Sequence, residues 1–303
     1  MTPLRVQRRL LRWYERHGRA NLPWRALRDP YRTVISEFML AQTQVERVVP
    51  KFEAFVERFP DFAALARASA ADVLREWKGL GYNSRAVRVQ HLAKVVVERH
   101  GGMLPRDGAA LRGLPGVGPY TAAAIRAFAF NIDDAPVDTN VRRVLHRLGL
   151  GVEHPPRATA RELAERARAL VPPGRAHDWN SALMDLGAAV CTARSPQCGK
   201  CPLRVDCAAA PIEPAQLRRS TPLRPGSVEG ALPFKRTTRY ARGRIVDRLR
   251  DLPPGRRISL LDLHRAVAPV IPERSVDDVR EFVRALERDG LVTSDGDGIA
   301  LRE

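Results

Sequence analysis

The 303-residue sequence lacks any long apolar run, and its first residues lack the apolar core of a secretory signal peptide. A membrane-spanning helix needs about 20 consecutive, mostly apolar residues. A signal peptide needs an apolar segment of about 7 to 15 residues behind a basic start. We therefore expect a soluble, cytoplasmic protein that has no membrane partner.

Cysteine is also scarce, and all four cysteines fall in one short segment with the spacing C-x6-C-x2-C-x5-C. Two disulfides in so short a loop are disfavoured in a reducing cytosol. Four thiolates from one loop suit either a tetrahedral zinc ion or an iron–sulfur cluster. The spacing leaves both open, because there is a single C-x2-C pair. The candidate ligands are Cys191, Cys198, Cys201 and Cys207.

Acidic residues are too few to balance the basic ones, with 34 Asp and Glu against 51 Lys and Arg and a net charge of +17. Such an excess suits a polyanionic partner, most simply nucleic acid. The alternative is a GC-rich genome that encodes arginine by preference.

Alternation of apolar and polar residues at period two is absent from the first 210 residues, which excludes an extensive half-buried sheet there. Apolar residues instead recur at helical spacing. The segments expected to be helical are 3–18, 30–45, 46–59, 62–66, 70–77, 84–99, 107–113, 121–130, 141–148, 158–171 and 176–190.

The composition changes after residue 210. Residues 211–239 contain several prolines and a cluster of basic residues, which predicts a linker near a polyanion. Residues 240–303 predict three helices followed by a β-hairpin, in the order of a winged helix. A small α+β packing or dimerisation module is the alternative.

The stretch from Leu111 to Arg143 organises the chain. Its glycines and prolines, Gly113, Pro115, Gly116, Gly118 and Pro119, permit a tight turn between two helices. Backbone N–H groups that open the second helix can bind a phosphate. Downstream, Asp138 precedes an amphipathic segment and predicts an N-cap.

Several separated motifs resemble the A/G-specific adenine glycosylases, the MutY family of helix-hairpin-helix DNA glycosylases. They are Leu114-Pro-Gly-Val-Gly118, Val137-Asp138, Ser36-Glu37-Phe-Met-Leu-Ala-Gln42-Thr-Gln44, Gly79-Leu-Gly-Tyr82, Met184-Asp-Leu-Gly187 and the four cysteines. The resemblance covers about residues 8–210 and implies a mainly α, two-lobed fold with a [4Fe–4S] cluster loop. It divides the chain into a six-helix domain (26–137), a cluster domain (1–25 and 138–210), the linker and the winged-helix-like module.

The resemblance also assigns catalytic roles. Glu37 matches the acid that protonates adenine N7, and Asp138 matches the carboxylate below the sugar. The proton makes the base a better leaving group, and the carboxylate opposes the positive charge that develops on the sugar. Glu37 would need a raised pKa, which its apolar helix could provide by desolvation. Asn140 would hold the catalytic groups. Tyr120 stands where bifunctional relatives have a Schiff-base lysine, so we expect base removal by water without strong strand cleavage.

The remaining implied roles concern the DNA. Gln42 and Tyr82 would fill and wedge the base stack when the adenine is extruded. The other implied substrate or DNA contacts are Trp24, Arg25, Leu40, Thr43, Gly116, Val117 and Gly118, with a monovalent cation bound in the hairpin. Basic candidates around the cysteine loop are Arg194, Lys200 and Arg204. The implied partner is double-stranded DNA with a mismatched or oxidised base pair, bound by a nucleoid-associated monomer.

Three departures from the family pattern concern specificity. Ala41-Gln42 stands where many members have two glutamines, and Ser181 stands where Glu or Gln is usual. The tail is too short and too helical for the β-rich domain that inspects 8-oxoguanine. A T/G or U/G mismatch glycosylase is one alternative, against which Glu37 argues because pyrimidines have no N7. A non-catalytic DNA-binding protein is another, against which the two carboxylates argue.

Overall fold

The computed structural model describes residues 2–153, 157–213, 217, 233–296 and 298–303. The chain forms two compact units. The first comprises Met1–Val34, Pro105–Gly113 and Val117–Pro225, and the second comprises Ile35–Leu104, Leu114–Gly116 and Gly226–Glu303. Helices dominate both, as the sequence predicts. No helix among these described residues is long and apolar enough to cross a membrane.

The first unit is built round the pairing of α1 with α11 and of α11 with α9. Leu10, Leu145, Trp179 and Leu183 belong to its buried core, and three cysteines of the 191–207 loop pack against that core. Its helices are α1 (Pro3–His17), α7 (Gly108–Arg112), α8 (Pro119–Ala124), the π-helical η1 (Ile125–Ala129), α9 (Thr139–Leu150), α10 (Ala160–Ala169), α11 (Ala176–Ala189), η2 (Cys198–Lys200) and η3 (Arg204–Asp206).

Local signals explain where these helices begin. Pro3 occupies the first turn of α1, where a missing N–H costs nothing. Thr159 and Glu162 form a reciprocal capping box at α10. The Ala-rich helix after Tyr120 departs from the plain α-helix expected from its composition, because it widens into η1 after Ala124.

The second unit has a helical part in which α3 to α6 surround large apolar side chains. Phe52, Phe55 and Trp77 are fully buried, and the rings of Phe55 and Trp77 meet edge to face at 5.8 Å. These helices are α3 (Val45–Arg58), α4 (Phe62–Arg67), α5 (Ala70–Glu76) and α6 (Ser84–His100); α2 (Pro30–Leu40) begins in the first unit and ends in the second.

The C-terminal part of the second unit is a small α+β module, as predicted. Strands β1 (Val292–Asp295) and β2 (Gly298–Leu301) are antiparallel, with Val292 opposite Leu301, and Ile258 bridges to Ile299 beside them. Its helices are η4 (Phe234–Arg236), α13 (Thr238–Arg250), α14 (Leu260–Val267) and α15 (Val276–Arg288). Of the predicted 211–239 linker, residues 214–216 and 218–232 lie outside the described residues.

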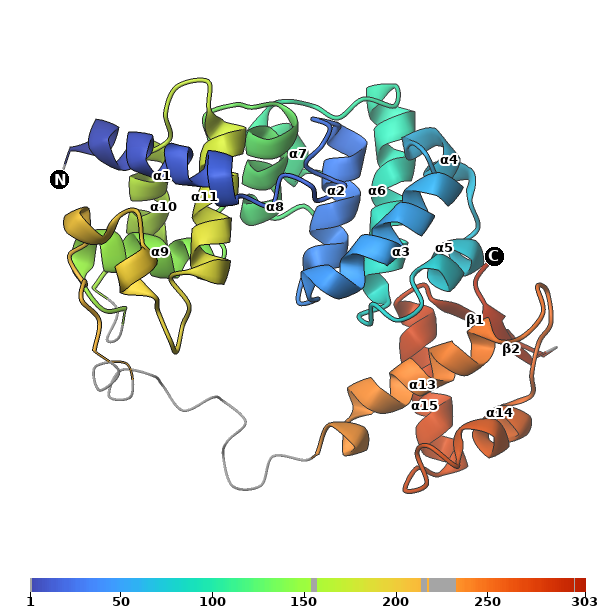
Figure 1. Ribbon diagram of the computed structural model, residues 1–303. Coiled ribbons are helices and arrows are strands. Elements are labelled where there is room, and N and C mark those ends of the chain that lie inside the picture. Colours follow the sequence, from blue (N-terminus) through green and yellow to red (C-terminus); the bar gives the residue numbers. More distant parts are fainter. Residues whose placement is uncertain (1, 154–156, 214–216, 218–232, 297) are drawn as a thin grey trace. The chain divides into compact units, whose positions relative to one another are not determined.

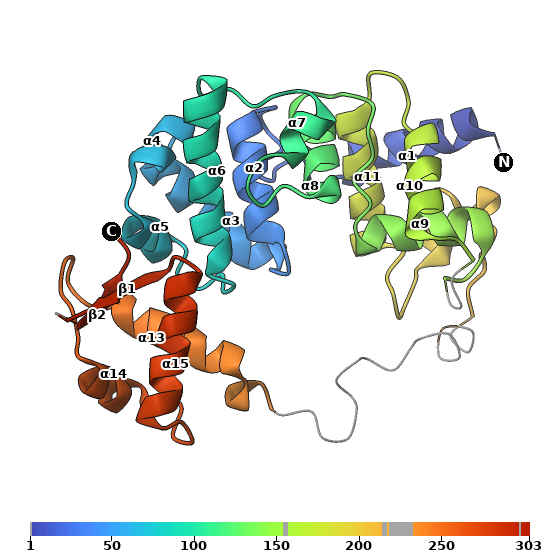
Figure 2. The ribbon, with the colours of Figure 1, turned by 180° about the vertical axis from the view of Figure 1, so that it is seen from behind.

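Helix α13 of this module packs beside α5, as both ribbon views show (Figures 1 and 2). The buried Arg250 donates to the Leu74 carbonyl at 2.8 Å and to the Asn83 side chain at 2.7 Å. Lys78 pairs with Asp251 at 2.8 Å on the exposed edge. A buried guanidinium that satisfies two acceptors fixes the module on the helical part of its own unit.

Candidate active site and nucleic-acid interface

The carboxylate of Asp138 is held at the start of α9. Its Oδ1 accepts from the backbone N–H of Val141 at 2.7 Å, which makes it the predicted N-cap. Its Oδ2 accepts from Nδ2 of Asn140 at 3.2 Å. Two donors therefore fix the position of the half-buried carboxylate.

Arg143 joins this pair to the cysteine loop. It donates to Oδ1 of Asn140, to the Gly187 carbonyl and to the Cys191 carbonyl, each at 2.7 Å. The approach is close: a Cβ at Gly187 would lie 2.7 Å from the Asn140 Cβ, so only glycine fits. The sequence analysis assigned Arg143 no role, although its place one turn after the cap was a signal that could have been read.

Arg147, one turn further along α9, is fully buried behind the cysteine loop. It pairs with Glu153 at 2.6 Å and donates to the Thr192 carbonyl at 2.7 Å. Its Nη1 also lies 3.6 Å from the Cys191 Sγ. A basic residue on an otherwise apolar helix face was the signal for this contact, which the sequence analysis missed.

The four cysteines are half-buried thiols without disulfides. Cys191, Cys198 and Cys207 all lie near enough to Cys201 to affect its pKa. Burial raises the pKa of Cys201 to about 11, and binding must displace these protons. Among the described side chains, no three His, Cys, Asp or Glu converge closely enough to hold one ion.

The second proposed carboxylate, Glu37, lies in the part of α2 that belongs to the second unit. It is half-buried, and its neighbours Ser36 and Phe38 are buried. Leu40, a predicted pocket residue, ends the helix and accepts from the backbone N–H of Thr43 at 3.1 Å. The apolar surroundings expected for the Glu37 carboxyl stay a prediction.

The proposed wedge residues, Gln42 and Tyr82, meet in the second unit, where the Tyr82 hydroxyl donates to Oε1 of Gln42. The buried side chain of Arg85 contacts both segments that carry these residues. Nothing in the sequence had singled it out. One nitrogen of its guanidinium donates to the carbonyls of Phe38, Met39 and Ala41 at 2.6, 3.0 and 2.7 Å.

The other terminal nitrogen of Arg85 donates to the Thr43 hydroxyl and to the carbonyls of Leu80 and Gly81, each at 3.2 Å. Burial lowers the pKa of Arg85 to about 10. A single cation thus joins the end of α2 to the 79–82 turn.

The hairpin glycines adopt the turn expected of them. Gly116 has φ +79°, and a Cβ there would lie 2.8 Å from the Arg88 side chain. Gly118 caps α8 ahead of Pro119, and Val117 is buried. Tyr120 stands in the first turn of α8 with its side chain about a third exposed.

Arg25 pairs with an acid instead of standing free. It binds both oxygens of the buried Asp185, at 2.8 and 3.2 Å, and Arg19 pairs with the same carboxylate at 2.7 Å. Burial by itself would raise the pKa of Asp185, but these arginines hold it below its ordinary value. Trp24, which precedes Arg25 in the chain, is half-buried. Ser181 is fully buried, and its hydroxyl has no hydrogen-bond partner in the described structure.

The cysteine loop exposes the basic side chains predicted there, Arg194, Lys200 and Arg204. Asp206, an acidic residue of the same loop, forms ion pairs with Arg9 at 3.2 Å and Arg5 at 3.4 Å. The exposed cations of the loop are suited to phosphate contacts.

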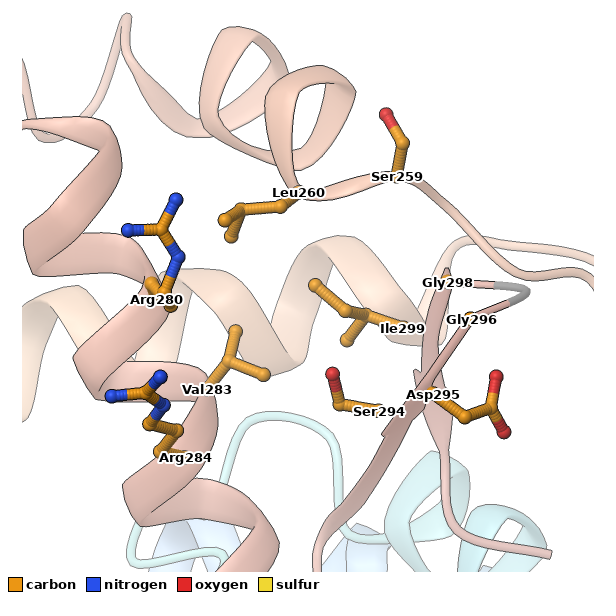
Figure 3. A pocket seen from close by; sticks show the side chains of 10 residues that line it. All are labelled: Ser259, Leu260, Arg280, Val283, Arg284, Ser294, Asp295, Gly296, Gly298 and Ile299. Atoms are coloured by element: carbon orange, nitrogen blue, oxygen red, sulfur yellow. The ribbon is translucent and has the colours of Figure 1, made fainter.

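The C-terminal module has a hollow of about 390 Å³ between α15 and the hairpin. Figure 3 shows Val283 and Ile299 near its centre and Arg280 and Arg284 along its α15 side. Arg280 pairs with Asp277 on its own helix.

Comparisons with known proteins identify two families that match the chain. Residues 35–169 match the HhH-GPD superfamily of base excision DNA repair proteins, and residues 191–207 match the iron–sulfur binding domain of endonuclease III. The cofactor of the loop is therefore a [4Fe–4S] cluster, and the matched segment contains all four cysteines.

Two solved structures share the fold. A thermostable thymine-DNA glycosylase is 33% identical, with a TM-score of 0.61 over 68% of this chain and 95% of that one. A non-covalent endonuclease III–DNA complex has a TM-score of 0.58 over 73% of this chain and 100% of that one, at 23% identity. The second likeness concerns the fold alone.

Among curated relatives, the adenine DNA glycosylase of Homo sapiens is 40% identical over 73% of this chain and 42% of its own length. The adenine DNA glycosylase of Mycolicibacterium smegmatis is 40% identical over 95% of this chain and 93% of its own length. A match of that extent reaches into the C-terminal module of this chain. Because that identity extends over nearly the whole of both proteins, the chain belongs to the adenine DNA glycosylase family within the HhH-GPD superfamily.

Proposed function

We propose that the protein removes adenine mispaired with 8-oxoguanine or guanine, by hydrolysing its N-glycosidic bond. The observation that carries the proposal is the Asp138 carboxylate, fixed by Val141 and Asn140. A preorganised carboxylate can stabilise the positive charge that develops on the deoxyribose as the bond breaks.

Glu37 is the proposed acid. Its proton goes to adenine N7, the electron pair of the broken bond stays with the base, and water adds to the sugar C1′. The family membership of the chain and the half-buried position of Glu37 support this role. The raised pKa expected for Glu37 stays a prediction.

Tyr120 supports the expectation that the reaction stops at an abasic site. A lyase step needs an amine that attacks the sugar, and a tyrosine cannot form a Schiff base. The described turn at Gly116 to Gly118 supports a phosphate contact and a bound monovalent cation in the hairpin.

The [4Fe–4S] cluster, when bound to the four cysteines, supplies iron–thiolate bonds that fix the loop. Arg143 connects the backbone of the loop to Asn140, which in turn contacts Asp138. We also infer that residues 26–137 act as one domain, that 1–25 and 138–210 act as the cluster domain, and that the protein binds DNA as a monomer.

The testing experiment uses duplexes that carry A opposite 8-oxoguanine, A opposite G, T opposite G and U opposite G. Products are scored with and without alkali. Adenine release with strand breaks that appear only after alkali is expected. Breaks without alkali would refute the monofunctional reaction.

A T/G or U/G mismatch glycosylase is the second candidate, favoured by the likeness to the thymine-DNA glycosylase structure. Release of T or U without A in the same experiment would move the protein to that class. A protein that binds all four duplexes and releases no base would be a non-catalytic DNA-binding protein.

A further inference from the structure

The proposed reaction gives no role to the pocket of the second unit that lies next to Tyr82. It has a volume of about 510 Å³, within the range of sites that bind small molecules. It lies where the C-terminal module meets the turn that carries Tyr82. Its walls are Gly81, Tyr82, Asn83, Ser84, Phe234, Thr238, Arg239, Tyr240, Arg242, Gly243, Arg244, Leu286, Asp289 and Leu291.

Aromatic rings and guanidinium groups alternate round this pocket. The rings of Phe234 and Tyr240 stand edge to face at 5.5 Å. Arg239 lies over the Tyr82 ring at 3.8 Å and over Phe234 at 5.5 Å, and Arg244 lies over Tyr240 at 5.2 Å. Proteins bind single-stranded nucleic acid with aromatic rings that stack on the bases and with neighbouring cations that contact the phosphates.

The positive charge of the pocket is incompletely neutralised. Arg242 pairs with Asp289, and Arg244 pairs with Asp247 at 2.5 Å. The contacts of Arg239 within the described part of the chain are the two rings. Arg85 lies over the same Tyr82 ring at 5.4 Å, and its pKa is lowered first by burial and further by the charge of Arg239. An anion placed here would relieve that repulsion.

One donor in the pocket also lacks a partner. The Nε of Arg244 is buried without a hydrogen-bond partner in the described structure. The Nε atoms of Arg85, Arg248 and Arg257 are unpaired in the same way, so this donor is open to a ligand's acceptor but does not by itself indicate one.

We propose that this pocket binds one unstacked nucleotide of duplex DNA, its base against Phe234 and Tyr240 and its phosphate beside Arg239. We assign it to the nucleotide left without a partner when the opposing adenine leaves the stack. This assignment rests on the proposed function, in which Tyr82 enters the stack, because Tyr82 also lines the pocket. A base that has lost its partner needs the least energy to unstack.

The test uses a duplex in which a tetrahydrofuran abasic analogue stands opposite 5-iododeoxyuridine, so that binding requires no base excision. A second duplex carries the iodinated base one position away in the same strand. Each is irradiated with the cluster-loaded protein, and cross-linked peptides are identified by mass spectrometry. The first duplex should cross-link to Phe234 or Tyr240, and the second should not.

Arg239→Ala should lower that cross-linking about tenfold, the size of one lost charged contact to the phosphate. Arg284→Ala is the matched control, since Arg284 is an exposed arginine of the same module that lines the other hollow (Figure 3). Phe234→Ala is a second variant, because Phe234 is 58% exposed and its loss leaves the buried core of the module intact.

Cross-links confined to residues outside the pocket would overturn the proposal, and so would equal losses in Arg239→Ala and Arg284→Ala. Equal cross-linking in the second duplex would overturn the assignment to the unpaired base. These failures are distinct from failure of the proposed function. A protein that removes adenine yet gives no pocket cross-link refutes the pocket alone, whereas one that removes no adenine refutes the glycosylase proposal.

Discussion

The Tyr82 hydroxyl donates a hydrogen bond to the side-chain carbonyl of Gln42, and both residues have left-handed backbone conformations, with φ of +47° and +61°. Such angles are strained for residues with side chains and persist where the surroundings enforce them. Arg85 provides that enforcement, because it binds carbonyls on both segments. These are the two residues that we propose as the wedge in the base stack.

Replacing Arg85 with methionine should remove this support. Several buried carbonyls would lose their donor, and we expect a loss of about 3 kcal/mol in the free energy of unfolding, measured by urea denaturation. Lysine should not restore it fully, since one ammonium lacks the planar fork. Arg161→Ala is the control: its exposed pair with Glu165 should contribute less than about 0.5 kcal/mol. Equal stability of wild type and Arg85→Met would contradict the role of Arg85 in holding the Gln42 and Tyr82 backbones in their left-handed conformations.

Asp138→Asn should separate chemistry from folding. Asparagine is as good an N-cap as aspartate, so α9 and the melting temperature should be preserved. The loss of charge should reduce single-turnover adenine excision by at least about 100-fold while DNA binding persists. Asp138→Ala should in addition lose about 1 kcal/mol of stability. Full activity in Asp138→Asn would remove the carboxylate from the mechanism.

Arg143→Gln tests the connection from the cysteine loop to Asp138. Asn140 would lose its guanidinium partner, and excision should slow by about tenfold or more through poorer positioning. The iron content of the purified variant should stay close to that of wild type, because Arg143 contacts the Cys191 carbonyl and supplies no cluster ligand. Loss of the cluster together with activity would mean that Arg143 supports the loop instead.

Asp185 gives a pH-dependent prediction. Its pKa in the folded protein is lower than its ordinary value, so the folded state binds fewer protons than the unfolded state as the pH falls. The stabilisation is complete above the ordinary carboxyl range and is lost as the pH drops through the folded pKa. Asp185→Asn should therefore cost about 3 kcal/mol at neutral pH, as expected for a broken buried pair, and less in acid.

The measurement for Asp185 is urea denaturation of wild type and variant at several pH values. Glu165→Gln, on an exposed helix pair, should show almost no difference at any of them. If the difference in unfolding free energy between wild type and Asp185→Asn grew as the pH fell, a lowered pKa of Asp185 in the folded protein would be contradicted.

Much of the fold could be predicted because the information is local. Helices such as α6 and α11 begin and end within a few residues of the expected positions, since apolar periodicity and capping residues act within a few turns. The glycines of the 113–118 turn and the spacing of the four cysteines are likewise local. The widening of η1 had no such local signal.

The contacts that complete the candidate site join residues far apart in the chain. Arg25 and Asp185 pair across 160 positions, Arg85 reaches the end of α2, and Arg239 lies over Tyr82. In the sequence these arginines are indistinguishable from the other basic residues. The sequence by itself determined the helices, the glycine turn and the grouping of the four cysteines in one short loop, because periodicity, turn chemistry and residue spacing are properties of short segments. The partners of buried charges were decided only by the tertiary structure, because a buried guanidinium must find its acceptors wherever packing brings them.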